Sequence, residues 1–181
     1  MEARIVAFDL ETTNLRANFG RILCCCFAPF DSDEVIVMRG DEKKYKKKKL
    51  YDDSELALDI KEYLEESWCW VTWNGKMFDV PFVNTRLTLS GQEPLYKRMH
   101  IDLMYYARRP NLKIHSSRLD AVAKTFALKE QKTDLTPEQW TEAMRLEKEA
   151  MDYIHKHCEQ DVKVLVELFP ILCPFIANIH R

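Results

Sequence analysis

The sequence lacks any long apolar run, and its charges nearly cancel. No stretch of the 181 residues approaches the ~18 consecutive apolar residues of a membrane span, which argues against a membrane partner. The first residues lack the basic-then-apolar order of a secretory signal, so we expect a cytoplasmic, intracellular protein. Because the net charge is only −2, any nucleic-acid binding must depend on local charge. The length predicts one domain over residues 1–181.

No Cys-x-x-Cys pair occurs among the six cysteines, which argues against a structural zinc site. Three cysteines are consecutive, Cys24 to Cys26, inside an apolar segment, and Cys69 lies between two tryptophans. In such surroundings cysteine behaves as a small buried hydrophobic residue. We therefore expect reduced thiols rather than disulfides.

The first half of the chain is rich in segments that favour β-strands. Apolar and β-branched residues predict strands over 4–10, 20–30, 34–38 and 68–74, and a short strand at 101–103. One helix is predicted over 55–67, with Asp53 or Ser54 as its cap, and another over 78–89.

The second half is mainly helical. One helix is expected after Ser116 or Ser117, and Thr136 and Pro137 have the pattern of a helix start. From there the chain is helical to about residue 169, as two helices, and Pro170 and Pro174 should end this regularity. Strands followed by helices predict an α/β architecture with helices packed on a mixed sheet.

Four acidic residues and a histidine are candidates for a site. Asp9 and Glu11 are two residues apart in a predicted strand, so their side chains project from the same face. Asp79 falls near the start of a predicted helix. His157 and Asp161 are four residues apart in a helix and share one side of it. Taken singly, each is also compatible with a solvated strand end, a helix-stabilising acid or a surface pair.

Together these residues indicate a metal centre. Carboxylates that converge without a counter-charge raise one another's pKa and destabilise the fold. Oxygen ligands of this kind suit Mg²⁺ or Mn²⁺. Two such ions, ~4 Å apart, can activate a water molecule and stabilise the leaving oxygen of a phosphodiester.

Three segments resemble, in order, the motifs of the DEDD superfamily of 3′–5′ exonucleases, which includes the proofreading domains of replicative DNA polymerases. The segments are FDLET at 8–12, WNGKMFDVPF at 73–82 and HCEQDV at 157–162. Their acids are separated by 70 and 82 residues, and the likeness extends over about residues 4 to 169. The resemblance implies an RNase H-like fold, with a mixed sheet of about five strands flanked by helices.

The resemblance also implies roles for individual residues. Asp9, Glu11 and Asp161 would hold the first of two divalent ions, Mg²⁺ or Mn²⁺, and Asp79 would bind metal mostly through water. Leu10 and Thr12 would line the pocket for the terminal nucleotide, and Asn74 and Phe78 would shape the path of the strand.

The third motif departs from the family pattern. One branch has Tyr four residues before the last Asp, and the other has His five before it; here His157 is four before Asp161. A histidine, with an ordinary pKa of about 6.5, can accept a proton from the attacking water. His155 is the competing candidate, but its position on the helix is far from that of Asp161, so we favour His157.

A lysine-rich segment is the most basic part of the chain. Six lysines surround Tyr45 within residues 43–49. We interpret Lys43, Lys44, Lys46 and Lys47 as part of a basic arm that attracts the phosphate backbone; the alternative is a solvated loop.

The leading hypothesis is a 3′–5′ exonuclease that releases nucleoside 5′-monophosphates from single-stranded DNA. DNA is favoured because the second motif is so similar to the polymerase branch. The alternatives are an RNA-trimming exoribonuclease, a catalytically silent nucleic-acid-binding module, and an α/β scaffold whose acids are surface charges. We expect a monomer, with any polymerase or other replication or repair partner acting in trans.

Overall fold

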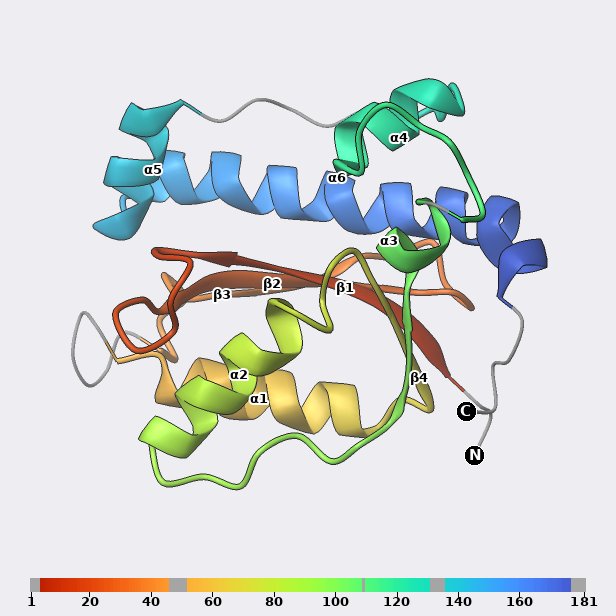
Figure 1. Ribbon diagram of the computed structural model, residues 1–181. Coiled ribbons are helices and arrows are strands. Elements are labelled where there is room, and N and C mark those ends of the chain that lie inside the picture. Colours follow the sequence, from red (N-terminus) through yellow and green to blue (C-terminus); the bar gives the residue numbers. More distant parts are fainter. Residues whose placement is uncertain (1–3, 46–51, 109, 131–135, 177–181) are drawn as a thin grey trace.

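A central sheet of five strands organises the computed structural model, which describes residues 4–45, 52–108, 110–130 and 136–176 (Figure 1). The strands follow the order β3-β2-β1-β4-β5. β1 is antiparallel to β2 and parallel to β4, so the sheet is mixed. The strands are β1 (Ile5–Thr12), β2 (Ile22–Pro29), β3 (Ile36–Arg39), β4 (Cys69–Thr72) and β5 (Met99–Asp102).

Helices cover both faces of the sheet, as Figure 1 shows. α1 (Ser54–Glu65) and α2 (Asp79–Leu89) pack on one face. The long α6 (Lys148–Leu172) crosses the other face, accompanied by the shorter helices of that layer. These are α3 (Leu103–Tyr106), α4 (Leu119–Thr125) and α5 (Pro137–Met144), and a 3-10 turn, η1 (Cys173–Phe175), follows α6. The predicted α/β fold, a mixed five-stranded sheet flanked by helices, is confirmed.

The strand alternation of β1 divides its side chains between the two layers. Val6, Phe8 and Leu10 belong to the core beneath α1 and α2, whereas Ala7 belongs to the core beneath α6. Since successive strand residues point to opposite faces, Asp9 and Glu11 project toward the α6 layer. The alternation of side chains along β1 is therefore enough to direct Asp9 and Glu11 to the same face of the sheet.

Two expectations about helix ends are wrong. Asp53 precedes α1, but its side chain does not cap the helix; it accepts the Ile22 backbone N–H at 2.7 Å and the Arg86 Nε–H at 3.0 Å. It thereby joins β2 to α2. Pro170 lies inside α6, which continues to Leu172, because a proline so near the end removes one backbone hydrogen bond without preventing the final turn.

The cysteines are reduced and mostly buried. All six are free thiols, and only Cys173 is partly exposed. Burial raises the pKa of Cys158, which keeps this thiol protonated and unreactive at neutral pH. No helix within the described ranges is both long and apolar enough to cross a membrane.

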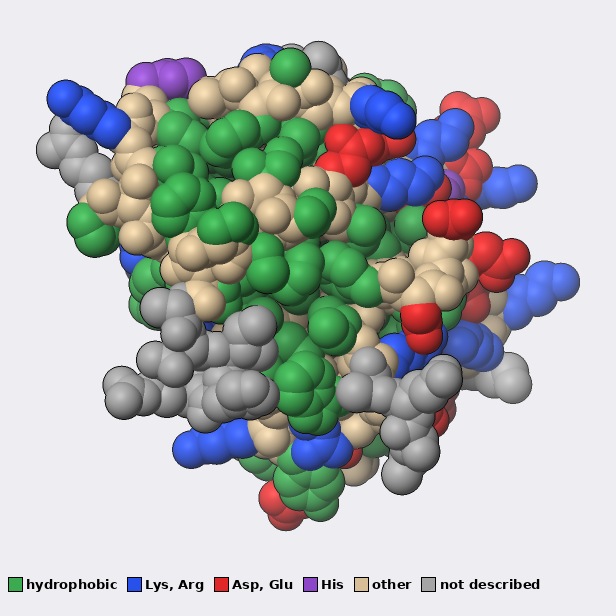
Figure 2. Space-filling model, turned by 90° about the vertical axis from the view of Figure 1, so that its right-hand side faces the viewer, with side chains coloured by type: hydrophobic (Ala, Val, Ile, Leu, Met, Phe, Trp, Pro, Cys, Tyr) green, Lys and Arg blue, Asp and Glu red, His purple; other side chains and the backbone are tan. Residues whose placement is uncertain are grey.

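The face at the C-terminal end of α6 carries charges of both signs (Figure 2). Apolar side chains occupy its centre, and basic and acidic side chains are intermingled along one side. This distribution agrees with the small net charge of −2. Binding of a polyanion to this face would depend on single residues rather than on a broad electrostatic field.

Candidate active site

β1 and α6 bring the first and third motifs into contact. His157 and Asp161 are both only 4% exposed and lie one helical turn apart on the side of α6 that faces the sheet. The His157 Nε2 atom is 3.7 Å from Glu11 Oε1 and 4.0 Å from Asp161 Oδ2. The Cys158 thiol donates to the Asp9 carbonyl oxygen at 3.3 Å, which holds α6 against β1 beside both acids.

Asp79 reaches β1 from the other helical layer. It is the first residue of α2 and is 2% exposed. Its Oδ1 atom accepts the Leu10 backbone N–H at 3.0 Å. β4 pairs with β1 only from Ile5 to Ala7, which explains why the Leu10 N–H, further along β1, is available for this bond.

The carboxyl group of Asp79 is held in an unfavourable environment for a negative charge. Its pKa is raised to about 7, mainly by burial and also by the negative charges of Asp102 and Asp161, although the Leu10 hydrogen bond acts in the opposite direction. The site therefore contains more negative charge than its surroundings neutralise, which is the condition that a bound cation relieves.

Replacing Asp79 with asparagine should change the pH dependence of stability in metal-free protein. The pKa is about 7 in the folded chain against an ordinary 3.8, so the folded state keeps a proton that the unfolded chain loses in this range. The free energy of unfolding then falls as pH rises through the window, by up to about 1.4 kcal/mol per pH unit. Urea unfolding in EDTA from pH 5 to 8 should show Asp79→Asn gaining stability relative to the wild type as pH rises; parallel profiles would contradict this.

The loop between β4 and α2 is shaped by a buried acid that the sequence analysis missed. Asp102, 0% exposed at the end of β5, accepts the backbone N–H groups of Asn74 at 2.8 Å and Lys76 at 3.1 Å. It also accepts the Met104 N–H at 3.2 Å and so caps α3. The one sequence signal was an acid between two apolar residues in the short strand predicted at 101–103.

The same loop depends on two residues of the second motif. Asn74 has a φ of 64°, a left-handed conformation that Asn adopts more readily than most residues. A Cβ atom at Gly75 would lie 2.4 Å from Thr72 Oγ1, so only glycine allows this close approach. The Asn-Gly pair therefore sets the turn that leads into Asp79.

Two pockets flank the acids. The first, about 370 Å³, is lined by Leu10, Glu11, Thr12 and Phe78, together with Trp140 and Met144 of α5. The second, about 400 Å³, includes Asp9, Asp161, Asn74 and Arg118. The structure thus brings the predicted residues Leu10, Thr12 and Phe78 to one pocket and Asn74 to the other. The sequence analysis gave Trp140 no role.

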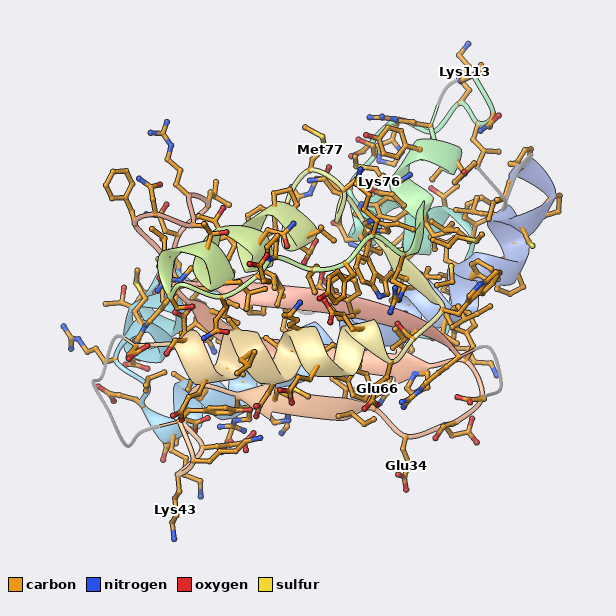
Figure 3. All side chains as sticks on the ribbon, turned by 90° about the horizontal axis from the view of Figure 1, so that it is seen from below. Glu34, Lys43, Glu66, Lys76, Met77 and Lys113 are labelled. Carbon is orange, nitrogen blue, oxygen red and sulfur yellow. The ribbon has the colours of Figure 1, made fainter. Side chains whose placement is uncertain are left out.

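Other predicted residues lie apart from the acids. The His155 Nδ1 atom is 2.9 Å from Arg39 Nη1, whereas His157 is the histidine beside Glu11. Lys44 Nζ is 2.9 Å from Asp59 Oδ2 on α1. Figure 3 shows Lys43 and Met77, a residue of the second motif, at opposite edges of the molecule. Lys46 and Lys47 lie outside the described residues, so the basic arm stays a prediction.

The carboxylate oxygens of the site are suitable ligands for a hard cation, but they are not arranged around a common point. Carboxylate oxygens are the ligands that Mg²⁺ and Mn²⁺ prefer. Within the described residues, no group of three or more His, Cys, Asp and Glu side chains has an arrangement that could hold a metal ion. Like-charged carboxylates repel one another in a metal-free protein, so a cation at this site would require these side chains to rotate from the positions they take in the structure.

A comparison of the chain with models of known protein families identifies its family. A family model of the RNase H superfamily matches residues 6–173, which is most of the chain. The chain belongs to the RNase H superfamily. This membership agrees with the mixed five-stranded sheet and its flanking helices.

A solved structure shares the RNase H-like fold of the chain. It is the family B DNA polymerase from the hyperthermophilic archaeon Pyrobaculum calidifontis, with a TM-score of 0.68 and 18% sequence identity. The match covers 97% of this chain but only 25% of the polymerase, so the chain corresponds to about a quarter of that protein. At this identity the likeness concerns the fold. No curated protein sequence matches the chain.

Proposed function

We propose that the chain is a metal-dependent 3′–5′ exonuclease that removes nucleoside 5′-monophosphates from single-stranded DNA. The observation that carries the proposal is the meeting of the motifs: Glu11 Oε1 lies 3.7 Å from His157 Nε2, which lies 4.0 Å from Asp161 Oδ2. Asp79 is tied to the same strand through Leu10 N. Membership in the RNase H superfamily and the shared fold of a DNA polymerase support a nuclease.

The roles proposed for the acids are those that the family resemblance implies. Asp9, Glu11 and Asp161 would hold the first of two Mg²⁺ or Mn²⁺ ions, Asp9 would also contact the second, and Asp79 would take part mostly through water. Bound ions would supply an activated water molecule and stabilisation of the leaving oxygen. His157 accepts a proton from the attacking water, whose oxygen bonds to phosphorus as the bond from phosphorus to the 3′ oxygen of the penultimate nucleotide breaks. That oxygen takes a proton from solvent and leaves as a 3′-hydroxyl, and His157 returns its proton to solvent.

The terminal nucleoside is placed in the pocket formed by Leu10, Thr12 and Phe78, because this pocket adjoins Glu11 and its lining is mainly apolar. A nucleobase buries its faces well in such a pocket, and its phosphate then lies toward the acids. The tyrosine-branch spacing with histidine in place of tyrosine is part of this proposal, as is a single nuclease domain over residues 1–181.

A degradation assay tests the function. With Mg²⁺, a 5′-labelled single-stranded DNA should give a ladder of shortened products, and a 3′-labelled strand should release labelled nucleoside 5′-monophosphate at once. EDTA should stop both reactions. An RNA strand of the same sequence should be degraded more slowly than the DNA strand. Faster cleavage of RNA would favour the exoribonuclease, cleavage of circular single strands would contradict an exonuclease, and binding without cleavage would indicate a silent module.

Replacing His157 with alanine should lower kcat by about 10²- to 10⁴-fold, the range expected for a lost general base. In the wild type the rate should fall at acid pH as His157 takes up a proton, and this acid limb should disappear in His157→Ala. The matched control is His155→Ala, because His155 contacts Arg39 on the other side of α6. Full activity of His157→Ala, or an unchanged acid limb, would rule out this role.

A further inference from the structure

The pocket beside Glu11 contains two aromatic side chains from different parts of the fold. Phe78 directly precedes α2, and Trp140 lies in α5, 62 positions further along the chain. Both side chains are half-buried, so each keeps ring surface that a ligand can contact. The volume, about 370 Å³, falls within the ~300–1,000 Å³ typical of small-molecule sites.

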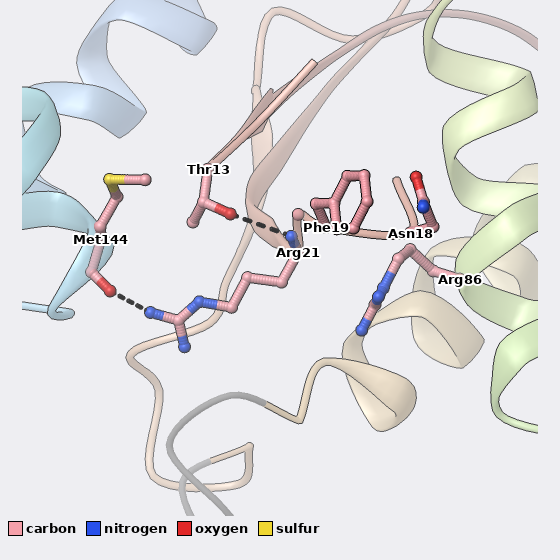
Figure 4. A pocket seen from close by; sticks show the side chains of 7 residues that line it. Thr13, Asn18, Phe19, Arg21, Arg86 and Met144 are labelled. Atoms are coloured by element: carbon pink, nitrogen blue, oxygen red, sulfur yellow. Dashed lines mark hydrogen bonds between the residues drawn. The ribbon is translucent and has the colours of Figure 1, made fainter. Parts of the chain in front are cut away.

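α5 is fixed to the body of the protein, so Trp140 is held in place. The helix packs against α6. Its own first turn is stabilised by a capping box, in which the Thr136 hydroxyl accepts the Gln139 N–H and the Gln139 side chain accepts the Thr136 N–H. In its last turn Ala143 is 0% exposed. At its end, the Arg21 guanidinium donates to the Met144 carbonyl oxygen, as Figure 4 shows.

The Arg21 contact connects α5 to the strand region that carries the acids. Arg21 directly precedes β2, and its backbone N–H donates to the Thr13 hydroxyl at 3.0 Å, just after β1. A positive guanidinium at the C-terminal end of a helix is also favoured by the helix dipole. The wall that carries Trp140 is therefore anchored to the segment that follows Glu11 and Thr12.

We infer that Trp140 is a base-stacking residue of this pocket and contacts the terminal nucleobase of the substrate, opposite the part of the wall that contains Phe78. This inference rests on the proposed function, which supplies the nucleotide. Every nucleobase has a π-face, so stacking of this kind binds all four bases without reading sequence. Trp140 is then a substrate-binding residue outside the three motifs, and it makes recognition dependent on the base rather than on the sugar and phosphate.

The test compares a ligand that has a base with one that lacks it. Isothermal titration calorimetry of the full chain in Mg²⁺ measures Kd for deoxyadenosine 5′-monophosphate and for deoxyribose 5-phosphate. Trp140→Ala should weaken the nucleotide about 10-fold or more and leave deoxyribose 5-phosphate within about 2-fold. Trp140→Phe, which keeps a ring, should stay within about 3-fold of the wild type for both ligands.

Trp68→Ala is the matched control. Trp68 is 42% exposed and lies at the other end of the sheet, where its backbone N–H donates to the Arg4 carbonyl at 2.8 Å. Both Kd values should match the wild type in this variant. A fluorescence titration adds a direct signal: the nucleotide should quench the wild type, and most of this quenching should be absent from Trp140→Phe although binding persists.

Each outcome decides between the possibilities. An equal loss for both ligands in Trp140→Ala would mean that Trp140 only supports the fold, and no loss for either would mean that it does not contact the base; both overturn the inference. If the base-dependent loss is found but no strand is degraded, the inference stands and the exonuclease proposal fails. If strands are degraded and Trp140→Ala binds the nucleotide normally, the exonuclease proposal stands and the inference about Trp140 fails.

Discussion

Replacing Asp161 with asparagine should lower the rate of strand degradation in Mg²⁺ by at least about 10³-fold while the protein stays folded. Asp161 is 4% exposed, its Oδ2 atom lies 4.0 Å from His157 Nε2, and it lines one pocket together with Asp9. Asparagine keeps the shape of the side chain but removes the negative charge that the proposed ions need. Because the substitution also removes one of several like charges, we expect no loss of stability in EDTA.

A variant of Glu159, two residues before Asp161, is the matched control for this experiment. Glu159 belongs to the same motif segment, but its carboxylate accepts from Lys163 Nζ at 2.7 Å on the outer side of α6. Glu159→Gln should therefore keep wild-type activity. Comparable loss in both variants, or full activity of Asp161→Asn, would contradict the assignment; circular dichroism and unfolding curves confirm that each variant is folded.

Replacing Asp102 with alanine should have the largest effect on stability, roughly 3 kcal/mol or more. The Asp102 carboxylate accepts three backbone N–H groups, and an unpaired buried donor costs about 1–3 kcal/mol. Its loss should also loosen the Asn74–Lys76 turn that leads to Asp79. Urea unfolding at neutral pH measures the first effect, and kcat at a temperature where the variant is folded measures the second.

Asp102→Asn separates the hydrogen bonds from the charge. An amide oxygen can still accept from Asn74 and Met104, which share Asp102 Oδ1, but the amide nitrogen cannot accept from Lys76. This variant should lose less stability than the alanine variant. Asp120→Asn serves as a control, since Asp120 is partly exposed and contacts Arg118 at 3.3 Å. If Asp102→Ala were as stable as that control, the role of Asp102 in the turn would be wrong.

The sequence predicted those features that depend on local periodicity. Alternation along a strand places Asp9 and Glu11 on one face, and helical spacing places His157 and Asp161 on one side of α6, as the structure confirms. The strands and the capping box at Thr136 depend on similarly local rules. Local patterns also predicted five strands and a mixed sheet, and the family resemblance implied the RNase H-like form of that sheet. The strand order was not predicted, because periodicity alone does not specify it.

The features that were missed depend on contacts between distant segments. Nothing near Asp102 in the sequence shows that its carboxylate will accept N–H groups from a loop 26 and 28 positions earlier. Asp53 was interpreted as a helix cap because it precedes α1, yet Ile22 and Arg86 use its carboxylate. Trp140 faces the pocket because α5 packs against α6 and because its Met144 carbonyl oxygen accepts from Arg21, 123 positions earlier in the chain.

The central claim is that folding gathers the four acids into a site for divalent cations, and a crystal soaked in Mn²⁺ tests it most directly. Anomalous scattering should show two Mn²⁺ ions between Asp9 and Asp161, with Glu11 in contact and with Asp79 nearby, after modest rotation of the carboxylates. The same soak of Asp161→Asn should show weakened or absent peaks. Manganese peaks elsewhere on the protein, with none within ligand distance of Asp9, Glu11 and Asp161, would contradict the claim.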